Sequence, residues 1–481
     1  MRKSVEEQIW DFAIRNPNKI AIINGNHRVS YATLCSSIIA AMDIYRKWGI
    51  GNSKCVVLSA GKQIEFVYSY FAAHLSGIKV VPIDSTTNID RLNFIINETS
   101  ACRLIGFDNK EFDVPCSALS DFSESSNSFD TPSFPNLHSV ADILFTTGTT
   151  GEPKGVELTF ANEASAAKNI NEYIGNTSDD IELLALPICH SFGLGRLRCC
   201  LSKGQTIILL NGFTNVKKLY RIISEERVTG FSMVPASWRY LQKMSGDKIT
   251  EFKSQLRYIE MGSSYMSGDE KKALANLLPT TRICMHYGLT EASRSTFLEF
   301  HEDEDHLDSV GKASPYTNIK VFDEHGMECP VDVDGEIGIK GAHVMNRYLN
   351  VSNNHIFFGY YFRTGDWGHL SQDGYLYLTG RKKDLINVGG KKVSPLEVEN
   401  QILKVGGVCD CACVSASDKE GFLGEVVKAF IVRENGCDLT FQEILNRIEG
   451  SLEYYKLPAQ WEWIERIPRT QNGKIKRNLL L

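Results

Sequence analysis

A chain of 481 residues is longer than one ordinary hydrophobic core accommodates, so its length predicts at least two domains. The composition, 43% hydrophobic and 23% charged, is that of a globular protein, and the net charge of −6 excludes the strongly basic surface typical of nucleic-acid-binding proteins. The first residues contain no apolar segment typical of a signal peptide, and no run of roughly 20 apolar residues follows. The thirteen cysteines follow no regular framework, so we expect a cytoplasmic protein without a signal peptide or a membrane span.

Strand-like and helix-like segments alternate through residues 1–300, which predicts a parallel α/β architecture. The clearest expected strands lie at 54–58, 79–83, 143–145 and 206–210. A stretch rich in Ser, Asp and Pro at 120–136 predicts a surface loop before the third of these strands.

Short strands with frequent turns follow, which predicts a β-rich subdomain; they are expected at 319–322, 335–340 and 375–378. The glycines and charges of 380–390 are typical of a domain boundary, and the last hundred residues restart a mixed α+β pattern. The expected fold class is α/β. A large N-terminal domain covers 1–380, with the β-rich subdomain at about 310–380, and a small α+β C-terminal domain covers 381–481.

Three cysteines near the C-terminus, Cys409, Cys411 and Cys413, alternate with other residues. Because side chains in a strand alternate between its faces, we expect a strand that carries the three sulfurs on one face. A metal site is the alternative, but no second pair of ligands stands at zinc spacing.

Residues 146–155 read Thr-Thr-Gly-Thr-Thr-Gly-Glu-Pro-Lys-Gly, directly after an apolar run, and predict a strand that enters a turn. Glycines let backbone N–H groups crowd around an anion, threonine hydroxyls add donors, and Lys154 adds a positive charge. Such a turn suits a polyphosphate, and ATP is the first candidate. A Walker P-loop does not fit, because Lys154 precedes Gly155 instead of Ser or Thr. Taken alone, the loop could also be a solvated hairpin.

Four further segments follow this loop in order. They are Tyr-Gly-Leu-Thr-Glu at 287–291, Arg-Thr-Gly-Asp at 363–366, Gly-Arg-Lys-Lys-Asp at 380–384 running on to Val-Ser-Pro at 393–395, and Pro-Arg-Thr-Gln-Asn-Gly-Lys at 468–474. Together with the loop, they resemble the adenylate-forming superfamily, which includes acyl-CoA synthetases, aryl-acid ligases and the adenylation domains of peptide synthetases. The resemblance covers nearly the whole chain, from Asn16 onward.

The resemblance implies an enzyme that joins a carboxylic acid to AMP with ATP and Mg²⁺ as cofactors. Attack of a carboxylate on a phosphate brings anions together, so the protein supplies cations, a metal and positioning. Glu291 is the implied ligand of Mg²⁺, a hard ion that prefers oxygen, and Thr290 the implied contact of the α-phosphate. The implied contacts of the β- and γ-phosphates are Thr146, Thr147, Gly148, Thr149, Thr150 and Lys154.

The nucleoside contacts are also implied by the resemblance. Tyr287, with Gly288 after it, would stack on adenine, and the turn Gly262, Ser263 and Ser264 would lie along the adenine and the acyl pocket. Asp366 and Arg381 would bind the ribose, because a carboxylate can accept hydrogen bonds from both hydroxyls.

The C-terminal domain would be mobile, according to the same resemblance. Lys474 would bridge the carboxylate and the α-phosphate, offsetting developing negative charge. The domain would then rotate about a hinge near Lys383 and bring in a thiol-binding face. Gly389 and Gly390 would line the tunnel for the pantetheine arm, although a Gly-Gly pair is also typical of an ordinary hairpin turn.

The acid is expected to lack an α-amino group. His190 matches the residue that borders the acyl pocket and gates entry of the thiol, and Ser191 stands where amino-acid-specific domains place an Asp. A neutral Ser cannot balance a buried ammonium. His286 stands before Tyr287 where many relatives have Gly, so an aromatic or compact acid is expected over a long fatty acid.

The function predicted from these residues is a carboxylate ligase that forms an acyl adenylate and then a thioester with coenzyme A. One alternative is a stand-alone adenylating enzyme that loads the phosphopantetheine arm of an acyl carrier protein, which would act in trans. Both acceptors share the same thiol arm, so the tunnel glycines do not separate them. A binding protein with an inactive site conflicts with the complete set of motifs, and nothing in the sequence selects a luciferase-like oxygenase.

Overall fold

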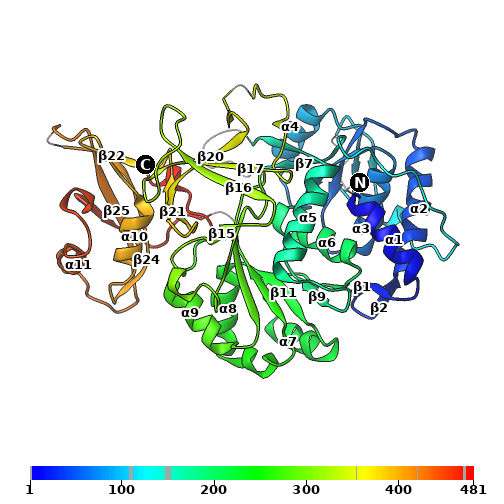
Figure 1. Cartoon of the computed structure of the whole chain (residues 1–481), viewed down its shortest axis with the longest axis horizontal. Coiled ribbons are helices and arrows are strands. Elements are labelled where there is room, and N and C mark those ends of the chain that lie inside the picture. The colour runs from blue at the N-terminus through cyan, green and yellow to red at the C-terminus, as the bar shows by residue number, and fades with distance from the viewer. Residues whose placement is uncertain (1–2, 108–111, 147–152, 354, 420, 470–472) are drawn as a thin grey trace. The chain divides into compact units, whose positions relative to one another are not determined.

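The computed structural model of the chain describes residues 3–107, 112–146, 153–353, 355–419, 421–469 and 473–481. The described residues form two compact units (Figure 1). The first unit comprises those within 3–146, 153–318 and 339–355, and the second those within 319–338 and 356–481.

The first unit is built on two sheets. The larger sheet has nine strands in the order β15-β14-β13-β12-β11-β9-β10-β1-β2, and its central strands run parallel. Its strands are β1 (Ile20–Asn24), β2 (His27–Ser30), β9 (Ile181–Leu184), β10 (Thr206–Leu209), β11 (Gly230–Met233), β12 (Tyr258–Met261), β13 (Arg282–Tyr287), β14 (Thr296–Glu299) and β15 (Lys312–Ala313).

The second sheet of this unit has seven strands in the order β18-β8-β7-β4-β3-β5-β6. Its strands are β3 (Cys55–Ser59), β4 (Lys79–Ile83), β5 (Arg103–Ile105), β6 (Cys116–Ser117), β7 (Val140–Phe145), β8 (Gly155–Thr159) and β18 (Arg347–Tyr348). The apolar, β-branched residues of β3, β4 and β7 are buried, as expected for strands covered on both faces.

Helices cover these sheets, and α5 and α6 pack side by side (Figure 1). The described α-helices of the unit are α1 (Val5–Arg15), α2 (Tyr31–Lys47), α3 (Ile64–Leu75), α4 (Ile89–Thr99), α5 (Phe160–Ile174), α6 (Ser191–Lys203), α7 (Val216–Glu225), α8 (Pro235–Ser245) and α9 (Gly268–Leu277). Capping residues in the sequence mark where several of these helices begin. At α5, for example, Thr159 and Asn162 form a reciprocal capping box, which satisfies two N–H groups at the helix end.

The second unit contains a mostly antiparallel arrangement with two helices among its described residues. One sheet has the order β16-β17-β20-β19 with β21 beside β20, a hairpin joins β22 to β23, and a third sheet has the order β24-β25-β26. The elements are β16 (Thr317–Phe322), β17 (Gly335–Gly341), β19 (Phe357–Phe358), β20 (Tyr361–Leu370), β21 (Leu376–Arg381), β22 (Ile386–Val388), β23 (Lys391–Val393), α10 (Pro395–Ile402), β24 (Val408–Ser417), β25 (Glu425–Arg433), α11 (Phe441–Ile448) and β26 (Gln460–Trp463).

The predicted fold class is confirmed, with a large α/β N-terminal part and a small C-terminal part. The expected strands coincide with β3, β4, β7 and β10, and residues 122–136 form no helix or strand. The domain boundary at residue 380 and the hinge near Lys383 stay predictions. No helix in the described part of the chain is long and apolar enough to cross a lipid bilayer.

The prediction for the cysteines of β24 is correct for two of the three. Cys411 and Cys413 are buried in one hydrophobic core, with Val427 and Ile431 of the neighbouring strand. Cys409 is exposed, because the strand pairing shifts register at the start of β24 and turns this residue away. The three sulfurs therefore do not share a face.

Candidate functional site

The predicted phosphate loop lies in sequence between β7 and β8, which pair antiparallel with Phe145 opposite Gly155. At its base, the Thr146 amide donates to the Lys154 carbonyl over 3.0 Å, and the Lys154 amide lies 3.4 Å from Thr146 Oγ1. Thr147, Gly148, Thr149 and Thr150 lie outside the described residues. The hairpin brings Thr146 and Lys154 together across eight residues of sequence.

The segment 287–291 begins at the end of β13 and forms a tight turn into β14. Tyr287 is buried, and its carbonyl accepts a hydrogen bond from the Ser295 amide over 2.8 Å. A Cβ on Gly288 would lie 2.5 Å from the Arg294 nitrogen, so only glycine fits this turn. The turn leaves Thr290 half-buried and Glu291 buried.

Tyr348 is a residue of this site that sequence reasoning missed. Its hydroxyl donates to Glu291 Oε1 over 2.7 Å, and the Lys154 ammonium lies 5.2 Å from the centroid of its ring. Strand β18 carries Tyr348 alongside β8, which holds it near Lys154. One ring thus connects the predicted phosphate-binding lysine with the predicted magnesium ligand. A carboxylate oxygen in such a polar setting fits Mg²⁺, which prefers oxygen ligands.

The turn after β12 contains the predicted nucleotide residues Gly262, Ser263 and Ser264. Ser263 is exposed and adopts a φ of 72°, in the left-handed region that non-glycine residues seldom occupy. Such a conformation costs about 1–3 kcal/mol and is often retained where the backbone approaches a ligand.

His286 lies against this turn at the edge of a buried network of charges. Its Nδ1 lies 2.8 Å from Glu260 Oε1, and the same oxygen lies 3.1 Å from Arg294 Nε. The Arg294 side chain is buried and donates to the carbonyls of Ser191 and Phe192 over 3.0 and 2.9 Å. Sequence reasoning found His286 but missed Glu260 and Arg294, although a Glu inside an apolar strand was a visible signal.

The electrostatics of this network keep His286 neutral. Burial lowers the pKa of His286, even though Glu260 acts in the opposite direction. Burial also opposes ionisation of Glu260, but Arg294 and His286 outweigh it and hold the pKa of Glu260 well below its ordinary value.

Gly262 is required by the position of His286. A Cβ on Gly262 would lie 2.2 Å from His286 Cε1, far inside van der Waals contact. We expect Gly262→Ala to lower the free energy of unfolding by about 1–3 kcal/mol, the usual cost of overpacking. Urea unfolding of Gly262→Ala in the wild-type and His286→Ala backgrounds measures this contact. The cost should largely disappear once the imidazole is removed, and an equal cost in both backgrounds would show that the contact is not responsible.

His190 and Ser191 stand where α6 begins. His190 is the N-terminal cap residue of the helix, and its carbonyl accepts a hydrogen bond from the Leu194 amide over 3.0 Å. Cys189, directly before it, is buried. Burial, with a further contribution from Asp84, raises the pKa of the Cys189 thiol to about 12.

In the second unit, the two predicted ribose contacts meet. Asp366 on β20 and Arg381 on β21 are directly paired across the strands, and Arg381 Nε lies 2.7 Å from Asp366 Oδ1. The Asp366 amide donates to Thr364 Oγ1 over 3.0 Å. Asp366 is buried, whereas 39% of the Arg381 side chain remains exposed. The sequence placed both residues at one ligand, and the strand pairing puts them in contact.

Gly389 and Gly390 form the two-residue turn between β22 and β23, with φ values of 57° and 87°. Positive φ at both positions explains two glycines in a row. Gly389 and Gly390 therefore form a hairpin turn, and their role in lining a tunnel for the pantetheine arm stays a prediction. Lys383 is exposed and lies before this hairpin.

Lys474 is exposed on a C-terminal segment that is anchored on both sides. Before it, Arg469 forms a bridge with Ile475 and an ion pair of 2.7 Å with Asp410. After it, Arg477 Nη2 donates to Glu399 Oε2 over 3.0 Å. These anchors, which sequence reasoning missed, hold the segment against α10 and β24 while the lysine faces outward.

Comparison with known families accounts for most of the chain. The model described as AMP-binding enzyme matches residues 9–349, and the one described as AMP-binding enzyme C-terminal domain matches residues 397–474. A curated relative, the 2-succinylbenzoate–CoA ligase of Bacillus licheniformis, is 28% identical over 480 residues, which are 96% of this chain and 97% of the relative.

Solved structures agree over nearly the full length. The o-succinylbenzoate CoA synthetase (MenE) of Bacillus subtilis is 26% identical; its complex with the acyl-adenylate intermediate OSB-AMP gives a TM-score of 0.89 and covers 98% of this chain and 97% of that chain. The complex of the same enzyme with ATP and magnesium gives a TM-score of 0.89, and the match covers 98% of each chain. ATP-bound MatB of Rhodopseudomonas palustris, 24% identical, shares the fold with a TM-score of 0.91 over 100% of this chain and 98% of that chain.

Proposed function

The chain belongs to the family of AMP-binding enzymes, and we propose that it is an AMP-forming acid–CoA ligase, which joins a carboxylic acid to AMP and then to the thiol of coenzyme A. The relatives named above support the reaction class, since they are CoA ligases that match along nearly the whole chain. The resident metal is Mg²⁺, which neutralises phosphate charge when it is bound.

The arrangement around Tyr348 carries this proposal. Lys154 and Glu291 lie on either side of one tyrosine, so a fixed cation and a metal-binding carboxylate are available to the same polyphosphate. Thr146 closes the base of the phosphate hairpin next to Lys154. An arrangement of this kind positions a triphosphate and holds the charge that a departing pyrophosphate carries away.

In the first half-reaction, a carboxylate oxygen forms a bond to the α-phosphorus of ATP, and the bond to pyrophosphate breaks. We assign Thr290 to the α-phosphate, Asp366 and Arg381 to the ribose, and Tyr287 to the adenine. Lys474 contributes an ammonium that offsets negative charge on the transferring phosphoryl group.

In the second half-reaction, the coenzyme A sulfur attacks the acyl carbon, and AMP leaves with the bonding electron pair. His190 borders this reaction and gates entry of the thiol. Gly389 and Gly390 admit the pantetheine arm, because they present no side chain to it.

The glycine turn offers a test of the second half-reaction. We expect Gly390→Leu to leave pyrophosphate release intact and to slow thioester formation by about 10²-fold, because the side chain obstructs the thiol arm. Gly436→Leu is the matched control: both glycines have positive φ, 87° and 79°, and open space beside them, so both substitutions carry similar backbone strain. An equal decrease of thioester formation in Gly390→Leu and Gly436→Leu would indicate a folding defect instead. An equal decrease of both half-reactions in Gly390→Leu would indicate the same.

The acid is a carboxylate without an α-amino group, and an aromatic or compact one. Ser191 offers no charge to an ammonium, and the neighbouring guanidinium of Arg294 would repel it. His286, packed against Gly262, occupies space that a long acyl chain would need.

Pyrophosphate release across a panel of acids tests the proposed function. The panel contains 2-succinylbenzoate, benzoate, short dicarboxylates and palmitate, each then offered with coenzyme A or with a phosphopantetheine-loaded carrier protein. We expect an aromatic or compact acid to release pyrophosphate and to form a thioester on coenzyme A. Transfer of the acyl group to the carrier protein but not to coenzyme A would contradict the proposal that coenzyme A is the acceptor. Higher activity with palmitate than with benzoate-sized acids would contradict the proposal that the acid is aromatic or compact.

A further inference from the structure

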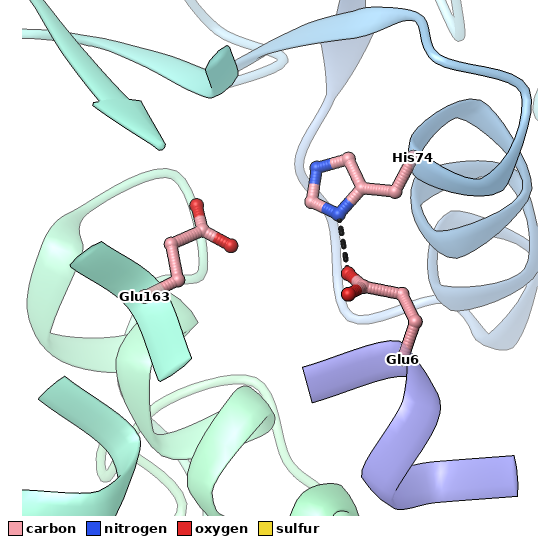
Figure 2. Close-up of side chains that lie close together, drawn as sticks. All are labelled: Glu6, His74 and Glu163. Carbon is pink, nitrogen blue, oxygen red and sulfur yellow. Dashed lines mark hydrogen bonds and ion pairs between the residues drawn. The ribbon is translucent and has the colours of Figure 1, made fainter. Parts of the chain in front are cut away.

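Five charged side chains from five elements converge in the core of the first unit, and the proposed reaction uses none of them. All are at least nine-tenths buried; they are Glu6 on α1, His74 on α3, Asp142 on β7, Glu163 on α5 and Arg198 on α6. Figure 2 shows the side chains of Glu6, His74 and Glu163 pointing toward one another from three helices. One ligand atom from each of these three lies within 4.8 Å of the others.

The orientation of His74 is fixed by carboxylates on both sides. Its Nδ1 lies 2.8 Å from Glu6 Oε1, and its Nε2 lies 3.2 Å from Asp142 Oδ1. Asp142 is itself held by the Tyr70 hydroxyl at 2.8 Å and by Arg198 Nη1 at 3.0 Å. Metal-binding histidines commonly have this arrangement, in which a carboxylate accepts from one ring nitrogen and the other nitrogen binds the ion.

Three buried carboxylate oxygens beside His74 remain without a hydrogen bond to any residue that the structure describes. They are Glu6 Oε2 and both oxygens of Glu163, of which Oε1 forms an ion pair with Arg198. A buried carboxylate oxygen without a hydrogen bond is costly, so Glu6 Oε2 and Glu163 Oε2 call for a cation or a proton. Both lie on residues whose side chains point toward His74 (Figure 2).

The charges of the cluster do not balance with a neutral imidazole. Three carboxylates, Glu6, Asp142 and Glu163, oppose the single guanidinium of Arg198, which leaves two buried negative charges. A divalent cation supplies that amount of positive charge. One imidazole nitrogen with carboxylate oxygens is a ligand set that suits Zn²⁺.

We propose that Glu6, His74 and Glu163 bind one zinc ion, with Asp142 orienting His74. The ion joins α1, α3 and α5, so it is structural and separate from the magnesium of the reaction. Ligand atoms on a tetrahedral zinc ion lie about 3.4 Å apart, so the 2.8 Å contact between His74 and Glu6 widens by about 0.6 Å when the ion binds.

Two protons are the competing occupants of this cluster. Burial lowers the pKa of His74, but its hydrogen bonds to Asp142 and Glu6 outweigh burial and raise it to about 10. Burial also raises the pKa of Glu163 well above its ordinary value. A protonated His74 and a protonated Glu163 would balance the same charges without metal, so the experiment must separate the two occupants.

Metal analysis of the full chain makes that separation. We expect close to one zinc per chain by mass spectrometry after purification without chelators, and close to none in Glu163→Gln or His74→Gln. His343→Gln is the matched control, because His343 is also a buried histidine but lies outside the cluster, and this variant should keep its zinc. Wild-type protein that neither contains zinc nor binds added ZnCl₂ after chelator treatment would overturn the proposal in favour of protons.

X-ray absorption at the zinc edge distinguishes this site from binding by cysteines, and it does not depend on the folding of any variant. The proposal predicts a first shell of nitrogen and oxygen at about 2.0–2.2 Å with the signature of one imidazole. Sulfur ligands at about 2.3 Å, or zinc retained in folded His74→Gln and Glu163→Gln proteins, would refute the assignment.

Discussion

Lys474→Ala is expected to lower the rate of acyl-adenylate formation by about 10²–10³-fold while leaving thioester formation from supplied acyl adenylate unchanged. The magnitude is that of removing one positioned group that stabilises transition-state charge. Only the first half-reaction develops charge on phosphorus, so only that half should be affected. Pyrophosphate release measures the first half-reaction, and thioester formation from synthetic acyl adenylate measures the second.

The structure makes this variant informative, because Lys474 is exposed and its segment is anchored by other residues. The free energy of unfolding should therefore change by less than about 0.5 kcal/mol. Lys476→Ala, an exposed lysine two residues further on, is the matched control and should retain both half-reactions. Adenylate formation at the wild-type rate in Lys474→Ala would show that Lys474 does not take part in the first half-reaction.

A free α-amino group on the acid is expected to lower kcat/KM for pyrophosphate release by a few hundred- to several thousand-fold. A buried ammonium without a counter-charge costs about 3–5 kcal/mol, which corresponds to that range. Ser191 is neutral, and its carbonyl is already bound by Arg294. The nearby carboxylate, Glu260, is paired with Arg294 and lies against His286, so it does not serve an ammonium.

Matched pairs of acids measure this effect, for example 3-phenylpropanoate with phenylalanine and propanoate with alanine. Within each pair, size and shape are nearly constant, so the ratio of kcat/KM isolates the ammonium. Ser191→Asp places a negative charge at the start of α6. This variant should reduce the ratio of kcat/KM between the acid without an amino group and the matching amino acid. A wild-type preference for the amino acids would overturn this reading of the pocket and leave the reaction class intact.

Local patterns in the sequence were sufficient to predict those features of the structure that depend on residues close together in the chain. The apolar run before Thr146 predicted β7, and the hairpin that follows brings Lys154 back beside it. The failure at Cys409 is also local: a shift in strand register does not follow from alternation alone. Asp366 and Arg381 were assigned to one ligand through resemblance, and their direct contact comes from strand pairing.

The contacts that were missed depend on register between distant segments. Tyr348 reaches Glu291 because Val344 forms a bridge with Ala292 and the Met345 amide donates to the Glu291 carbonyl, and nothing in the sequence near either segment specifies that pairing. Glu260 meets His286 only because β12 and β13 are adjacent and parallel. Such contacts fix the geometry of the candidate site, which is why the sequence predicted its residue types better than its arrangement.

The burial of Cys189 has a consequence for the proposed reaction, because Cys189 directly precedes His190. An acyl adenylate is a mixed anhydride, and any nearby thiolate would capture the acyl group and inactivate the protein by self-acylation. Burial raises the pKa of the Cys189 thiol to about 12, so the thiol stays protonated near neutral pH. In the proposed reaction, the Cys189 thiol, next to His190, would therefore not compete with the incoming thiol.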